Sequence, residues 1–179
     1  MQLTRLPLVA AGLAAAILLS ACSGGDGTAA QQANADTAPV GTGPTADLDF
    51  TATQLSGDDF SGTSLEGKDT VLWFWAPWCT SCRLEAPAVV QAAADFDGSV
   101  EVIGVAGRGE VAAMEAFVSD TGTSGLRHVM DPDGTIWTDF GVIGQPAFAF
   151  VNDDGSTEVF VGGLGGDALA ERMTALSES

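Results

Sequence analysis

The distribution of apolar and polar residues from about residue 47 onward predicts an α/β domain. Continuous apolar runs rich in β-branched and aromatic side chains occupy residues 71–76, 100–106 and 146–151. Runs of this kind are typical of strands that are buried on both faces in the middle of a sheet. Shorter strands are expected at 126–130 and, after the Asp153-Asp154-Gly155 turn, at 157–161.

The segments between these strands have helical spacing or helix-favouring composition. The expected helices cover residues 79–96, 109–120 and 135–140, and a last one that Asp167 caps. Strands and helices therefore alternate until a late hairpin, which predicts parallel pairs with right-handed crossovers and an antiparallel edge. The expected architecture is a mixed sheet flanked by helices.

The N-terminus has the pattern of an export signal. Arg5 precedes an apolar run over residues 6–19, and about 14 residues are too few to span a bilayer but suit a signal-peptide core. The run ends in Leu19-Ser20-Ala21-Cys22, which resembles the lipobox of bacterial lipoproteins. On this interpretation the peptide is cut before Cys22, whose lipid holds the protein at the outer face of the membrane. The alternative is an ordinary secretory signal in which Cys22 is incidental.

Residues 23–46 are rich in Gly, Ala, Thr, Gln, Asp and Pro, without apolar periodicity. This composition is typical of a flexible tether. We therefore expect a lipoprotein signal peptide at 1–21, a lipidated Cys and tether at 22–46, and one folded domain at 47–179. The localisation expected from this organisation is extracytoplasmic, with membrane attachment by lipid.

The amino-acid composition supports a folded domain and argues against nucleic acids as partners. Hydrophobic residues make up 46% of the 179 residues and charged residues 17%, so a real core is possible. The net charge is −18, from 24 acidic and 6 basic residues. Such a surface repels the phosphates of nucleic acids. We therefore expect no nucleic-acid partner.

The candidate chemistry lies in Trp78-Cys79-Thr80-Ser81-Cys82-Arg83, at the junction of a buried strand and a helix. Free backbone N–H groups and the positive end of the helix dipole favour a thiolate at Cys79. Cys82 follows one turn later, close enough to close a small disulfide ring. A thiolate in this setting attacks a disulfide, and the second thiol resolves the mixed disulfide. The pattern predicts thiol–disulfide exchange, with no cofactor.

Other uses of the cysteines fit less well. A purely structural disulfide across so short a loop constrains few unfolded states. His128 is the only histidine and is expected away from the pair, at a core edge or on the surface, so the ligands of a zinc site are missing. The Asp131-Pro132-Asp133-Gly134 turn lacks the glutamate of a calcium loop, because its twelfth position is Val142. No metal site is expected, although Cu(I) binding by two thiolates stays open as a minor alternative.

Several motifs resemble those of known proteins. The stretch 74–82, Phe-Trp-Ala-Pro-Trp-Cys-Thr-Ser-Cys, resembles the active site of thioredoxin-fold proteins, and its continuation 83–87, Arg-Leu-Glu-Ala-Pro, is similar to the TlpA/ResA/DsbE branch. VLWFWAPWC, GVAGRGEVAAMEAFV and residues 144–148, Gly-Gln-Pro-Ala-Phe, are similar to secreted DsbE-like proteins of actinobacteria. The resemblance covers the chain from about residue 47 to its end.

The resemblance implies a thioredoxin-like fold with a TlpA-type extension before the first core strand. It assigns Cys79 as the nucleophile, Cys82 as the resolving thiol and Pro146 as a cis-proline facing the disulfide. A cis-proline leaves the preceding backbone free to pair with an extended client, so Gln145 is a candidate client-binding residue. Trp78 and Trp75 are candidates for an apolar platform beside the sulfurs, although core packing suits Trp75 better.

Two positions bear on the direction of exchange. Trp73 stands where cytoplasmic thioredoxins carry a buried Asp, so that proton acceptor is missing. Glu85 matches a glutamate of the ResA-like branch and is a candidate proton shuttle for Cys82. The alternative for Glu85 is a carboxylate on the helix surface or one paired with Arg83. The Thr80-Ser81 dipeptide differs from those of thioredoxin and of strong oxidants.

The sequence therefore indicates an extracytoplasmic thiol–disulfide oxidoreductase that acts on exported proteins, and we favour disulfide formation. The alternative is a reductase that keeps thiols free, for example on apocytochrome c during haem attachment. The expected membrane partner is a VKOR-like oxidase in the first case and a CcdA-like electron donor in the second. A copper-handling thioredoxin-fold module is the minor alternative.

Overall fold

The structure is a computed structural model that describes residues 44–179. The expected signal peptide at 1–21, the lipidation site at Cys22 and most of the tether lie outside the described residues. Within the described part, no helix is both long enough and apolar enough to cross a membrane.

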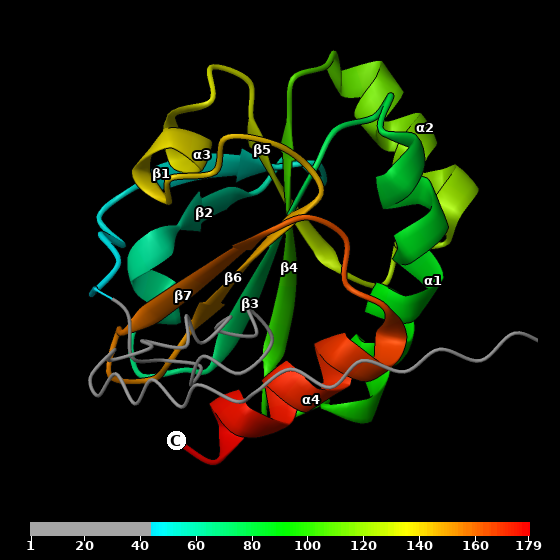
Figure 1. The fold of residues 1–179 in the computed structure, drawn as a ribbon. Helices are drawn as coiled ribbons and strands as arrows, with labels where there is room; N and C mark the ends of the chain where they lie inside the picture. Colours follow the sequence, from blue (N-terminus) through cyan, green and yellow to red (C-terminus); the bar gives the residue numbers. More distant parts are fainter. Residues whose placement is uncertain (1–43) are drawn as a thin grey trace, which may run out of the picture. The chain divides into compact units, whose positions relative to one another are not determined.

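A seven-stranded mixed sheet forms the centre of the domain, in the strand order β2-β1-β5-β4-β3-β6-β7 (Figure 1). The inner strands β3, β4 and β5 are parallel, whereas β6 and β7 run antiparallel to their neighbours. This confirms the predicted parallel pairs and the antiparallel hairpin at the edge. The strands are β1 (Thr51–Gln54), β2 (Asp59–Ser61), β3 (Thr70–Trp75), β4 (Glu101–Gly107), β5 (Arg127–Asp131), β6 (Ala147–Val151) and β7 (Thr157–Val161).

The helices confirm the predicted segments. They are α1 (Thr80–Asp95), α2 (Val111–Thr121), α3 (Thr135–Asp139) and α4 (Gly166–Ser177), with a 3₁₀ turn, η1 (Gly62–Leu65), before β3. Asp167 was wrongly predicted as the cap of the last helix. The N-cap of α4 is Gly165, and Asp167 lies in the first turn, where its charge still suits the helix dipole.

Alternating side chains of the central strands divide the core into two layers. Trp73 and Trp75 of β3 face α1, α2 and α4, together with Phe117 and Met173 of the helices. The other face of the sheet is covered by α3 and by the segment that precedes β3 (Figure 1). Because β3 is buried along its whole length, the end of this strand is a rigid support for whatever follows it.

The segment before β3 forms the expected N-terminal extension. Strand β1 pairs antiparallel with β2 and with β5 and so extends the sheet at one edge. Leu48, Phe60 and Leu65 bury their side chains against the sheet. The chain already pairs with the β6–β7 hairpin at Thr45, which forms a bridge with Ser156. The contacts of the domain therefore begin before residue 47, inside the segment predicted as tether.

Candidate redox site

The two cysteines lie where β3 gives way to α1, at the carboxyl edge of the parallel strands (Figure 1). Cys79 is the N-cap of α1 and has extended backbone angles. It forms a disulfide with Cys82, with the Cα atoms 5.3 Å apart. The backbone N–H of Cys82 lies 3.1 Å from Sγ of Cys79 and donates to it. The helix N-terminus therefore points a free donor at this sulfur, which stabilises a thiolate there after reduction.

The two sulfur-bearing residues differ in access to solvent. Cys79 is 5% exposed, whereas Cys82 is fully buried at 0%. A client can therefore reach only Cys79 without opening the helix. This asymmetry supports the roles implied by the resemblance, with Cys79 as the attacked or attacking sulfur and Cys82 as its internal partner.

The peptide bond between Gln145 and Pro146 is cis, as the resemblance implied. Pro146 is buried, and its carbonyl accepts a 2.8 Å hydrogen bond from the N–H of Gly162. Gln145 is half-buried just before β6. The strand β6 lies next to β3 in the sheet, and β6 begins level with the end of β3, because Ala147 pairs with Phe74. The cis-proline segment and the cysteine segment therefore share one edge of the sheet.

Glu85 is buried, with 8% of its surface exposed. Its Oε2 accepts a 3.1 Å hydrogen bond from Nε1 of Trp73, and its Oε1 accepts a 2.5 Å hydrogen bond from the N–H of Leu164. Burial raises the pKa of Glu85 to about 7, although both hydrogen bonds act in the opposite direction. A carboxyl group with this pKa exchanges its proton readily near neutral pH.

These contacts exclude the alternative for Glu85. The residue is neither on the helix surface nor paired with Arg83, whose guanidinium instead lies 3.3 Å from Asp120. Glu85 follows Cys82 by one helical turn, so both project from the same face of α1. A Cβ added at Gly163 would lie 3.2 Å from Oε1 of Glu85 and 3.7 Å from Cγ of Pro146, so the acid and the cis-proline both lie close to this glycine.

The two tryptophans near the cysteines have different surroundings. Trp75 is fully buried and stacks on Phe117 with ring centroids 4.1 Å apart, so it is a core residue and not part of a client platform. Trp78 is 61% exposed. Its indole Nε1 donates a 2.7 Å hydrogen bond to the carbonyl oxygen of Arg108, which holds the ring on the surface beside Cys79. Trp78 therefore fits the predicted platform.

Arg108 is a site residue that the sequence analysis missed. It follows β4 directly and is held at φ +56°. Its guanidinium donates to Oε1 of Gln145 at 3.1 Å and to the carbonyl of Ile143 at 3.4 Å. Its position in the sequence could have indicated this role, because it directly follows a buried parallel strand and therefore lies at the same end of the sheet as the cysteines.

The prediction that His128 lies at the edge of the core or on the surface was wrong, because the residue is buried inside the core. It is buried in the inner strand β5, and its ring contacts Trp75 edge-on. Its Nε2 lies 3.0 Å from the carbonyl oxygen of Thr123, and burial lowers its pKa. In residues 44–179, no group of three or more His, Cys, Asp or Glu side chains is arranged to hold a metal ion.

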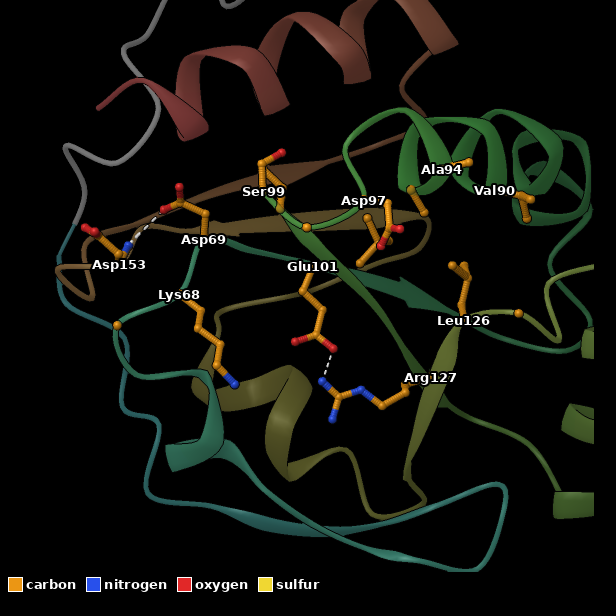
Figure 2. A pocket seen from close by; sticks show the side chains of 16 residues that line it. Lys68, Asp69, Val90, Ala94, Asp97, Ser99, Glu101, Leu126, Arg127 and Asp153 are labelled. Carbon is orange, nitrogen blue, oxygen red and sulfur yellow. Dashed lines mark hydrogen bonds and ion pairs between the residues drawn. The ribbon is translucent and has the colours of Figure 1, made fainter.

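A pocket lies at the opposite end of the parallel strands. It has a volume of about 890 Å³ and is lined by the starts of β4 and β5 and by the residues just before β3 (Figure 2). Figure 2 shows Glu101 and Arg127 facing each other as an ion pair, and Asp69 accepting from the N–H of Asp153. Because β3, β4 and β5 are parallel, their starts are a full strand length away from Cys79. The pocket is therefore separate from the redox site.

Comparison with known proteins gives consistent matches. The family model described as AhpC/TSA matches residues 45–159. The soluble secreted antigen MPT53 of Mycobacterium tuberculosis is 45% identical over 134 residues, which cover 73% of this chain and 76% of that protein.

Two solved structures are similar along almost their full length. Mycobacterium tuberculosis DsbF, in mixed oxidised and reduced forms, has 47% identity and a TM-score of 0.71, covering 75% of this chain and 99% of that chain. A secreted Mycobacterium tuberculosis disulfide oxidoreductase homologous to E. coli DsbE has 43% identity and a TM-score of 0.68, covering 72% and 97%.

Proposed function

Since the chain belongs to the AhpC/TSA family, as a thioredoxin-like thiol–disulfide oxidoreductase of the DsbE and DsbF type, we propose that it forms disulfides in exported proteins outside the cytoplasmic membrane. The observation that carries this proposal is the disulfide of Cys79 and Cys82 at the N-terminus of α1, with Cys79 on the accessible side. The similarity to a secreted antigen supports the location.

The reaction begins with a thiolate of the client attacking Sγ of Cys79. A bond forms between the client sulfur and Cys79, the Cys79–Cys82 bond breaks, and Cys82 leaves as a thiolate. A second client thiolate then attacks the client sulfur of this mixed disulfide and releases the thiolate of Cys79. The client loses two electrons and gains a disulfide, while the enzyme gains the same two electrons as a reduced pair. The N–H of Cys82, which points at Sγ of Cys79, stabilises the released thiolate.

Glu85 supplies the proton that the buried Cys82 needs in this cycle. Cys82 has no access to solvent, so a thiolate formed there is stabilised by protonation from a neighbouring group. Glu85 lies one turn further on the same helix face, and its raised pKa of about 7 leaves it partly protonated at neutral pH. In the reverse direction the same carboxylate accepts the proton of Cys82.

Clients bind along the edge that carries both Trp78 and the cis-proline segment. Trp78 offers an exposed aromatic face beside Cys79, and Ile143 is 84% exposed in the segment before Pro146. Gln145 precedes the cis bond, where backbone groups are suited to pairing with an extended chain. These features favour a client segment that is extended and apolar around its cysteine.

The absence of an acid in β3 supports the proposed direction. Trp73 occupies the position at which cytoplasmic thioredoxins carry the Asp that assists reduction of clients.

One observation favours the opposite direction, reduction of clients, as a second candidate. Glu85 brings a buried carboxyl group to the site from α1, and a proton acceptor for Cys82 is what a reductase of apocytochrome c or of other thiols requires.

Thiol trapping in living cells separates the two directions. A pair that is mostly disulfide supports disulfide formation, and a mostly reduced pair supports the reductase. The reduction potential of the purified domain is an independent measure, because strong oxidants lie near about −120 mV and reductants near about −270 mV. A reduced pair with a potential near the lower value would overturn the proposal.

Membrane attachment through a lipid on Cys22 and a membrane redox partner complete the proposal. The partner is VKOR-like if the pair is reoxidised and CcdA-like if it is kept reduced. Replacing Cys22 with Ala should release the protein from the membrane fraction without changing the rate of exchange in vitro, which cell fractionation and an activity assay measure together. Retention of the variant in the membrane would contradict the lipid anchor.

A further inference from the structure

Arg108 connects segments of the redox edge that are far apart in the chain. Its carbonyl oxygen accepts from Nε1 of Trp78, beside Cys79, at 2.7 Å. Its guanidinium donates to Gln145 and to the carbonyl of Ile143 in the cis-proline segment. The guanidinium also lies 4.6 Å from the ring centroid of Trp137, with which it makes a cation–π contact. One residue therefore contacts both sides of the edge on which clients bind.

The backbone of Arg108 has an unfavourable conformation. Among residues 44–179 it is the only non-glycine residue with a positive φ, at +56°. For a residue with a Cβ this region is sterically unfavourable. The neighbouring Gly109 leaves no space for a side chain, because an added Cβ would lie 2.3 Å from Cγ of Pro77. The loop that contains Arg108 and Gly109 therefore packs tightly against the segment that leads to Cys79, and this packing fixes the backbone of Arg108.

We infer that Arg108 is a positioning residue for client binding, which joins Trp78 and the segment 143–145 into one surface beside the disulfide. The inference rests on the exchange with polypeptide clients proposed above, in either direction. Trp78 and Ile143 are both exposed, and Arg108 links them, because its backbone carbonyl accepts from Trp78 and its guanidinium donates to the carbonyl of Ile143. A surface held in place in advance loses less conformational entropy when a client binds.

The contacts of Arg108 distinguish this role from a catalytic one. Its side-chain acceptors are the neutral oxygens of Gln145 and Ile143, and its hydrogen bonds reach neither sulfur. Removing the guanidinium should therefore weaken binding of long clients and leave the chemistry at Cys79 unchanged. It also leaves no carboxylate without a partner, so the variant should fold.

The test uses Arg108→Gly, because glycine accepts the positive φ and keeps the carbonyl that binds Trp78. The substrate is a synthetic peptide with two cysteines in an apolar sequence, supplied as dithiol with glutathione disulfide to reoxidise the enzyme, and as disulfide with glutathione to reduce it. An enzyme working in either direction therefore turns it over. We expect KM for the peptide to rise about fivefold to tenfold with kcat unchanged. Turnover of the small substrate 2-hydroxyethyl disulfide, which cannot span the surface, should not change.

Three further variants sharpen the result. Arg108→Lys, which offers one compact donor and no planar fork, should show an intermediate KM and decides the question if the glycine variant does not fold. Gln145→Ala should raise KM, and its effect should be smaller in the Arg108→Gly background because both act through one contact. The control Arg127→Ala removes the same charge at the opposite edge and should leave both substrates unaffected.

The inference would be overturned by an unchanged KM for the peptide in Arg108→Gly. A parallel loss with 2-hydroxyethyl disulfide, or a shifted reduction potential, would also overturn it, because either would place the effect at the sulfurs. An error in the proposed direction would look different. It would appear in the wild-type preference for dithiol or disulfide peptide and would leave the ratio between variant and wild type intact.

Discussion

Nε1 of Trp73 lies 3.1 Å from Oε2 of Glu85 and donates a hydrogen bond to it inside the core. Trp73 comes from the middle of β3 and Glu85 from the second turn of α1, so this bond joins the strand and the helix that together present the cysteines. The buried acid of this site is therefore supplied by the helix, and the strand position that carries Asp in cytoplasmic thioredoxins supplies its donor.

Replacing Glu85 with Gln should slow exchange and flatten its dependence on pH. The wild-type rate should change across pH values near 7, because the pKa of Glu85 is about 7 and the proposed mechanism has this group exchange a proton with Cys82. We expect a loss of about tenfold to a hundredfold at neutral pH, as for a general acid–base group. Stopped-flow measurement of the exchange rate from pH 5 to pH 9 tests this, and the wild-type profile should fit the titration of about one proton. An identical profile for Glu85→Gln and for the exposed control Glu115→Gln would contradict it.

The same substitution should alter the pH dependence of stability. Burial raises the pKa of Glu85 from 4.5 to about 7, so between these values the folded protein holds a proton that the unfolded chain has lost. The contribution of Glu85 to stability is therefore full below pH 4.5 and declines as the pH rises toward 7. Relative to Glu85→Gln, the wild type should lose free energy of unfolding across this window. Urea denaturation of the oxidised proteins measures it, and a constant difference between them would be the contrary result.

Trp73→Phe and Trp75→Phe should differ in cost although both tryptophans are fully buried in β3. Nε1 of Trp73 donates to Glu85, whereas Nε1 of Trp75 has no hydrogen-bond partner in the described part of the chain. Both variants lose packing, but only Trp73→Phe leaves a carboxylate oxygen without its donor. We expect an extra loss of about 1 to 2 kcal/mol in the free energy of unfolding.

Trp73→Phe should also raise the pKa of Glu85 further, because it removes a hydrogen bond that stabilises the carboxylate form. NMR titration of the Glu85 side chain measures this shift, and Trp75→Phe serves as the control. Equal stability losses in the two variants together with an unmoved pKa would show that the hydrogen bond has no energetic weight.

Gly104→Ala should destabilise the domain by about 3 kcal/mol through overpacking. A Cβ at this position in β4 would lie 2.1 Å from Nδ1 of His128 and 2.7 Å from Nε1 of Trp75, both in rigid core positions. Gly125→Ala is the matched control, because a Cβ there meets no atom within 4 Å. Guanidinium denaturation compares the two, and a Gly104→Ala variant as stable as the control would mean that β4 and β5 can separate at little cost.

The local elements and the place of the cysteines followed directly from the order of residues. Apolar runs for β3, β4 and β6, a turn before β7 and a Cys-x-x-Cys motif after a buried strand are features of neighbouring residues, and they determine strand, turn and helix start by short-range sterics and hydrogen bonding. The same is true of the amphipathic last helix. For this reason these segments were predicted to within a few residues at their ends.

The partners of the polar side chains at the site depended on how the elements pack. Glu85 receives its second hydrogen bond from Leu164, 79 residues away, and Arg108 reaches Gln145 across 37 residues. Spacing along the Ala-rich α1 did not distinguish a buried carboxyl from a surface one, because alanine marks the inner face of a helix only weakly. The burial of His128 has the same origin. β5 has neighbours on both sides only because β1 adds a strand to the sheet beyond it, and a pairing between distant strands leaves no periodic trace in either one.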